Sequence, residues 1–201
     1  MTDLDKIFTM IGKKTPFHNF RKNLYRIDVI HKISEDLKQN DCDQLDYKGL
    51  LLNQAYLIYM VASWQGFVEN LAKRYFTFVV NDTKNTAVLK VMEQKMERSI
   101  AGFNTPSANG INTLFKEVFG LDNIMSQVTS GELDNKNTKK KLNKLLNCRH
   151  EIAHEAFCKS DELTDDILIS YRKFLLELAV NLEDTLVKEL GESLNGFVSN
   201  R

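Results

Sequence analysis

Apolar residues recur at three- and four-residue spacing along most of the chain, a pattern typical of amphipathic helices that pack into a bundle. Only two prolines, Pro16 and Pro106, interrupt the 201 residues, so long stretches contain nothing that would break a helix. No alternating pattern of strands, internal repeat or low-complexity segment is present. The sequence therefore predicts an all-α fold, a bundle of about five to seven helices.

The apolar stripes also predict where the helices lie. The segment 46–80 is apolar almost all round, so it should form the central and most buried helix. Gly120 is expected to end a short helix, Asn137 or Thr138 to begin the next one, and Thr164 to begin the last. The predicted helices cover residues 17–37, 46–80, 84–100, 111–119, 138–157 and 164–190, after a short amphipathic start that carries Leu4, Ile7, Phe8 and Ile11.

Length and composition favour one globular domain, because 43% of the 201 residues are hydrophobic and can form a sizeable core. Residues 1–44 are interpreted as an N-terminal extension and residues 45–190 as the core. The chain carries 27 basic and 27 acidic residues, so no overall field attracts nucleic acid or an anionic membrane. Any binding to such a partner must come from a local patch.

The same features predict a cytoplasmic protein that does not span a membrane. No apolar run approaches the roughly 20 residues that a bilayer requires, and the N-terminus lacks the pattern of a secretory signal. Cys42, Cys148 and Cys158 are odd in number, far apart and without a Cys-x-x-Cys pair. We therefore expect three free thiols in a reducing compartment, and neither a disulfide framework nor a sulfur-ligated zinc site.

One segment, 149–154, combines residues that carry chemistry. Arg149 falls in the middle of a predicted apolar arc, where an unpaired guanidinium would be costly, so it should be paired or lie at a cleft. His150 and His154 are one turn apart at the edge of this arc, and Glu151 should face solvent. An always-charged phosphate ligand beside groups that transfer protons near neutral pH suits phosphodiester cleavage. The arc consists of Leu142, Leu145, Leu146, Ile152, Ala153, Ala156 and Phe157.

The segment His150–His154 also matches the HExxH pattern, in which two histidines bind zinc and a glutamate acts as general base. This short pattern occurs by chance, and Glu151 is predicted to point away from the histidines. A zinc metalloprotease is therefore the less favoured alternative. Its third ligand would come from Glu162, Asp165, Asp166 or Glu177.

The run Leu145-Leu146-Asn147-Cys148-Arg149-His150-Glu151-Ile152-Ala153-His154 resembles the Arg-x4-6-His motif of the HEPN superfamily. The run Ser63-Trp64-Gln65-Gly66-Phe67-Val68-Glu69-Asn70-Leu71 is similar to a Ser-Trp-acidic-x-Phe helix of its RiboL-PSP-like branch. Asn104-Thr105-Pro106, followed by Ile111, Leu114, Phe115 and Phe119-Gly120-Leu121, also resembles that branch. The resemblance covers about residues 45–190.

The resemblance implies a metal-independent endoribonuclease, commonly a homodimer in which two motif helices form one composite RNA site. Such proteins often serve as toxins or antiviral-defence effectors, with an antitoxin or defence-system partner. Carried onto this sequence, His154 would act on the ribose 2′-hydroxyl, Arg149 would hold the scissile phosphate, and His150 would position the phosphate or transfer the second proton. Glu69 would orient Arg149.

The sequence departs from the family pattern at three positions. His150 replaces the commoner Asn, and Gln65 stands where the acidic residue after the tryptophan is expected, two positions before Glu69. Ala156 replaces the tyrosine of HEPN toxins that are controlled by a partner nucleotidyltransferase. We therefore do not expect that mode of control in this protein.

A basic run begins the motif helix, and it offers a second way to bind RNA. Lys140, Lys141 and Lys144 could guide an RNA strand toward the site, since neutralising phosphates needs only a few local cations. Such a run is more often a solvated helix face. The alternative to a ribonuclease therefore remains a helical domain that binds RNA or a protein without cutting anything.

Overall fold

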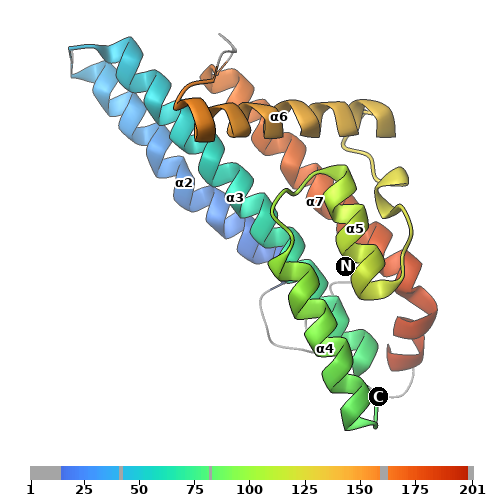
Figure 1. Ribbon diagram of the computed structural model, residues 1–201. Helices are drawn as coiled ribbons and strands as arrows, with labels where there is room; N and C mark the ends of the chain where they lie inside the picture. Colours follow the sequence, from blue (N-terminus) through green and yellow to red (C-terminus); the bar gives the residue numbers. More distant parts are fainter. Residues whose placement is uncertain (1–14, 41–42, 82, 159–162, 199–201) are drawn as a thin grey trace.

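The computed structural model describes residues 15–40, 43–81, 83–158 and 163–198, the last seven of these, 192–198, by their backbone alone. Within these residues the chain is all helical, which confirms the predicted fold class (Figure 1). The predicted amphipathic start, residues 4–11, lies outside the described residues. The elements are α2 (Pro16–Gln39), α3 (Leu45–Val80), α4 (Thr86–Ala101), α5 (Ala108–Phe119), the 3-10 helix η1 (Ile124–Ser126), α6 (Asn135–Glu155) and α7 (Asp165–Val198).

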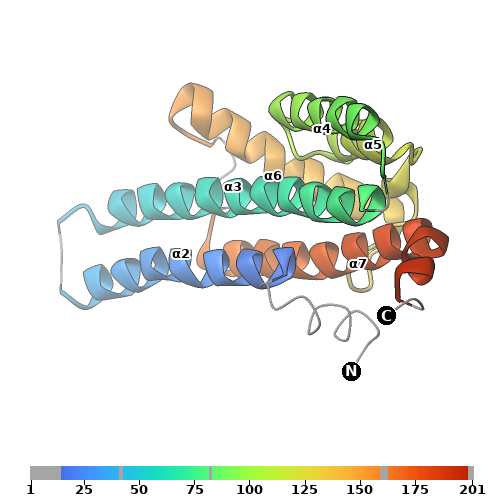
Figure 2. The ribbon, with the colours of Figure 1, turned by 90° about the horizontal axis from the view of Figure 1, so that it is seen from below.

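Helix α3 is the centre of the molecule, as its apolar sequence predicts. Helices α2 and α7 both run along it (Figure 2), while α5 and η1 pack at its side and α6 crosses over it (Figure 1). Trp64 and Phe67 of α3 stack with ring centroids 5.5 Å apart, and Phe20 of α2 lies 5.3 Å from Phe67. Because Phe20 and Leu24 belong to the buried core, α2 is part of the bundle and not an extension to it.

Most helix ends lie where the local sequence predicts them. Gly120 ends α5 in the left-handed region (φ 75°), and the Thr164 hydroxyl accepts a hydrogen bond from the Ile167 N–H in the first turn of α7. The predicted start of α6 at Asn137 or Thr138 is wrong, because Asp134 accepts the Asn137 N–H at 2.7 Å and the helix begins at Asn135. The first turn of α6, Asn135 to Thr138, contains only polar side chains, so hydrophobic periodicity gives no signal there.

No helix in the described ranges has both the length and the apolar character needed to cross a membrane.

A buried carboxyl group, Glu183 of α7, makes the stability of the bundle dependent on pH. Burial raises its pKa to about 7, although the hydrogen bond from the Tyr75 hydroxyl, at 3.3 Å, and the charge of Arg74 oppose this shift. Between the ordinary pKa of a glutamate and about 7, the folded protein keeps a proton that the unfolded chain has lost. The free energy of unfolding should therefore fall as the pH rises through this interval, by an amount on the order of 3 kcal/mol, and level off above it.

We expect Glu183→Gln to remove most of this fall, because the amide does not titrate and its oxygen can still accept the Tyr75 hydroxyl. Denaturant unfolding of the variant and the wild type between pH 5 and pH 8 measures the effect. Glu93→Gln on α4, where the glutamate is exposed, is the matched control and should retain the wild-type profile. Equal pH profiles for wild type and Glu183→Gln would contradict this account.

Candidate functional site

The last two turns of α6 carry the predicted catalytic residues on an open face. Arg149, His150 and His154 are all exposed, and the two histidine rings lie with centroids 4.3 Å apart, one above the other along the helix. Ala153 of α6 and Phe157, two residues past the end of this helix, are exposed as well, Phe157 to 46%. The structure therefore exposes Arg149 and both histidines, together with apolar side chains that are near them in the sequence.

This arrangement corrects the prediction that Arg149 lies within the apolar contact of the helix. Thr138, Leu142 and Leu145 are buried in the first half of α6, whereas Cys148 and Ile152 are buried near its end. Helix α6 crosses the bundle at an angle and does not lie along it (Figure 1), so neighbouring elements cover only part of the predicted apolar arc in its last two turns. Arg149 is left on the open side, and so are Ala153, Ala156 and Phe157, which were predicted to be buried.

The surroundings of Glu151 differ from those of the two histidines. Its side chain is half-buried and lines a groove between α6 and α7, so the prediction that it faces open solvent is wrong, whereas Glu155 is exposed. In the ranges that the structure describes, no group of three His, Cys, Asp or Glu residues is placed to hold a metal ion. Two of the third zinc ligands considered from sequence are engaged elsewhere: Asp165 pairs with Lys38 at 2.9 Å, and Glu177 accepts the Ser130 hydroxyl at 3.2 Å. Asp166 is exposed in the first turn of α7. Glu162 lies outside the described residues.

The predicted supporting residue, Glu69 on α3, is half-buried and is not brought to Arg149. Its Oε1 accepts a hydrogen bond of 3.0 Å from the side-chain amide of Gln65, and the same amide donates to the Phe103 carbonyl at 3.0 Å. The departure from the family pattern at Gln65 thus has a structural effect. Gln65 and Glu69 together anchor the turn that follows α4, and the role of Glu69 toward Arg149 stays a prediction.

Cys148 and Cys158 form a disulfide in this structure, so the prediction of free thiols is wrong for both. Their separation in sequence gave no sign of it. Ala156, in the left-handed region (φ 56°), ends α6 and reverses the chain, which brings the two Cα atoms to 5.6 Å. The bridge encloses the segment that contains Arg149 and His154. Cys42 lies outside the described residues.

The predicted RNA-binding lysines of α6 have different surroundings. Lys140 and Lys144 are exposed, but Lys141 packs against α7. Its Nζ donates to the Ser170 hydroxyl at 3.0 Å and lies 5.1 Å from the centroid of the Phe174 ring. Burial lowers the pKa of Lys141, because desolvation disfavours its charged form. Lys141 is therefore a link between the two helices.

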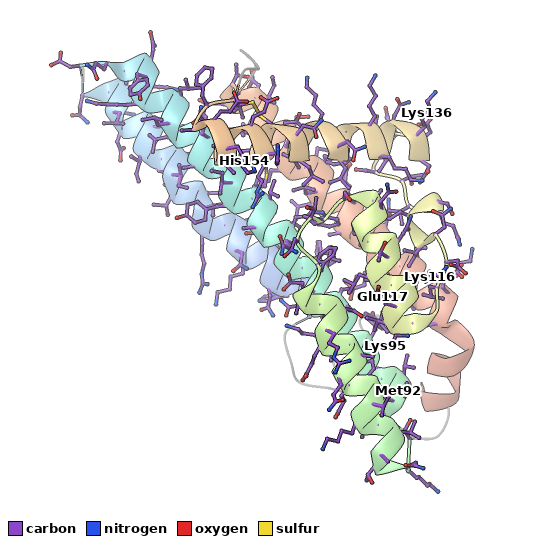
Figure 3. All side chains as sticks on the ribbon, viewed as in Figure 1. Met92, Lys95, Lys116, Glu117, Lys136 and His154 are labelled. Atoms are coloured by element: carbon purple, nitrogen blue, oxygen red, sulfur yellow. A yellow bond between two sulfur atoms is a disulfide. The ribbon has the colours of Figure 1, made fainter. Side chains whose placement is uncertain are left out.

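The groove between α6 and α7, with a volume of about 1080 Å³, is the main feature that sequence reasoning missed. It is lined by Lys136, Lys139 and Asn143 in addition to the predicted lysines. A signal for it exists in the sequence, since polar residues recur at three- and four-residue spacing along one side of α6. A second hollow, of about 790 Å³, lies between α4 and α5, and its lining includes the basic residue Lys95 and the acidic residue Glu117 (Figure 3). No residue of the motif helix α6 lines this hollow.

Comparison with known proteins supports the resemblance noted in the sequence. The family described as RiboL-PSP-HEPN matches residues 17–188, which include all of α3, α4, α5 and α6. No curated protein and no solved structure matches the chain. Since the family match extends over far more than half of the chain and the bundle is all helical, this protein belongs to the RiboL-PSP-HEPN family.

Proposed function

We propose that this protein is a metal-independent endoribonuclease whose site is formed by Arg149, His150 and His154. The observation that carries the proposal is the pair of exposed imidazoles, with ring centroids 4.3 Å apart, one residue after an exposed arginine on the same helix. Imidazoles accept and donate protons near neutral pH, and a guanidinium binds phosphate through parallel hydrogen bonds. Both requirements of phosphodiester cleavage are thus available at one surface.

The proposed reaction is attack by the ribose 2′-oxygen on the adjacent phosphorus. His154 takes the proton of the 2′-hydroxyl, and a second imidazole, His150 or its equivalent in another copy of the chain, gives a proton to the 5′-oxygen as its bond to phosphorus breaks. The products are a 2′,3′-cyclic phosphate and a 5′-hydroxyl, so atoms and protons balance without water or metal. Arg149 neutralises the charge that increases on the non-bridging oxygens.

The partner that we propose is a second copy of the chain. An in-line displacement places the base and the acid on opposite sides of the phosphorus, but His150 and His154 project from one face of one helix. Pairing of two motif faces would supply groups on both sides and would cover the exposed Phe157. By analogy with the family, we also propose a role as a toxin or defence effector with a cognate antitoxin or defence-system partner.

The test is cleavage of total RNA by the purified protein in excess EDTA. Wild type and Glu151→Gln should both cut, because neither a metal nor the Glu151 carboxylate has a part in the proposed reaction. Products that end in a 2′,3′-cyclic phosphate, and a dimer in sedimentation, are expected. No RNA cleavage by any form, together with zinc-dependent cleavage of a protein substrate that Glu151→Gln abolishes, would favour the HExxH alternative.

A further inference from the structure

The groove between α6 and α7 is strongly basic although the chain as a whole is neutral. Five lysines line it, against a single carboxylate, that of Glu151. All five come from the first half of α6, and among the residues that the structure describes, Lys136 and Lys140 take part in no salt bridge. The local potential of this groove therefore favours an anionic ligand.

A line of polar side chains joins this groove to the histidine pair. Its members are separated by four, three, four, three and four residues, so they lie on one side of the helix, and all are exposed. Figure 3 shows the two end members, Lys136 and His154, at opposite ends of α6. At about 1.5 Å per residue, the line extends over roughly 27 Å. It consists of Lys136, Lys140, Asn143, Asn147, His150 and His154.

We propose that this line, the α6 track, binds a single-stranded RNA and guides it to the histidines. The lysines would neutralise phosphates, and the amides of Asn143 and Asn147 can donate to phosphate or base oxygens. The groove beside the lysines also includes half-buried apolar side chains, Leu133 and Ile167, that unpaired bases can contact. A base-paired helix exposes no base faces to such a surface, so the chemistry favours a single strand.

The α6 track deepens the proposed function, since it names the form of RNA and the direction from which the strand reaches the site. It does not depend on cleavage, because phosphate contacts act equally on an RNA that cannot be cut. Lys141 is not part of the track, as its ammonium group is engaged with Ser170 and the aromatic rings of α7. Of the lysines chosen from the sequence, the track therefore keeps Lys140 and leaves out Lys141 and Lys144, and it adds Lys136.

The test is binding of a short 2′-O-methyl oligonucleotide, which lacks the attacking hydroxyl, measured by fluorescence anisotropy over a range of salt concentrations. Lys136→Gln/Lys140→Gln should weaken binding at least fivefold at low salt. The slope of log affinity against log salt should decrease by about 1.4, at about 0.7 for each phosphate contact on a single strand. Lys73→Gln/Lys90→Gln, which removes two exposed lysines of α3 and α4, is the matched control and should bind like wild type.

A second variant tests the part of the track between the lysines and the histidines. Asn143→Asp/Asn147→Asp introduces two carboxylates at exposed positions and should weaken binding by a similar factor. Unchanged affinity in both double variants would overturn the proposal, whether or not the protein cuts RNA. If an oligoglutamate peptide binds as tightly as the oligonucleotide, and Lys136→Gln/Lys140→Gln no longer binds the peptide, the RNA proposal is overturned in favour of an acidic protein partner.

The α6 track and the proposed function can fail separately. Lysine-dependent binding of the oligonucleotide by a protein that cuts no RNA would support the track and leave a binding module. Cleavage of long RNA at the wild-type rate by Lys136→Gln/Lys140→Gln, with unchanged oligonucleotide affinity, would support the ribonuclease and overturn the track.

Discussion

His154→Ala is expected to lower the single-turnover rate of RNA cleavage by at least about 100-fold, because general acid–base catalysis contributes about 10²–10⁴ to such reactions. Arg149→Ala should have an effect of about 10²–10³, as removal of a group that stabilises charge in the transition state does in other enzymes. The measurement is the cleavage rate of one labelled RNA at saturating protein, with EDTA present.

These two variants are informative because the residues are exposed and outside the core. Substitutions at such positions change the free energy of unfolding by about 0.5 kcal/mol or less, so thermal unfolding and sedimentation should match the wild type. Arg26→Ala removes an exposed arginine of α2 and His31→Ala a half-buried histidine of the same helix, and both should cleave at the wild-type rate. Wild-type rates in Arg149→Ala and His154→Ala would rule out the assigned site and leave the binding-module interpretation.

Trp64→Ala is expected to have the largest effect on stability, a loss of about 3–5 kcal/mol in the free energy of unfolding. The indole is fully buried between Phe20 and Phe67, so truncation leaves a cavity that these rings cannot fill. Its Nε1 also donates a 3.0 Å hydrogen bond to the Pro106 carbonyl, which ties the turn before α5 to α3. This loss is a large part of the 5–15 kcal/mol typical of a folded domain.

Denaturant unfolding monitored by circular dichroism measures this loss. Trp64→Phe keeps a ring in the core but removes the donor to Pro106, so its loss should be smaller. Tyr59→Ala on the same helix is the control, because Tyr59 is 56% exposed and its side chain should contribute little. A Trp64→Ala protein as stable as the control would contradict the central place given to α3.

The sequence predicted the helices well where one side of each helix is buried along its whole length. Helix α3 was expected at 46–80 and lies at Leu45–Val80, because apolar residues fix both its extent and its place in the core. The start of α6 was misplaced by a few residues, since Asp134 and the polar first turn contribute capping but no periodicity.

The residues of the candidate site could be named from the sequence, but the environment of their side chains could not. The spacing of Arg149 and His154 was sufficient to place them on one helix, but a helical wheel assumes that the same face is buried from end to end. Helix α6 crosses the bundle, so near its end Cys148 and Ile152 stay buried while Arg149, in the middle of the predicted arc, is exposed. Only the tertiary arrangement contains this information.

The polar side of α6 is visible in the sequence, but the disulfide and the helix that closes the groove could not be predicted, for a related reason. The Cys148–Cys158 pairing depends on the left-handed turn at Ala156, a conformation that an alanine gives no reason to expect. The groove depends on how α7 packs beside α6, and periodicity within one helix does not determine which neighbour it meets.

The separation between core and site has a consequence for how such a domain can evolve. The side chains that determine folding are buried on α2, α3, α5, α6 and α7, whereas Arg149, His150 and His154 are exposed on α6. The positions that determine the fold and those proposed to carry the chemistry therefore overlap little. Selection can change one set of positions with little effect on the other. Under the proposed mechanism, a single substitution at His154 would leave a folded protein that still binds RNA but no longer cuts it, so active and inactive members can be neighbours in sequence.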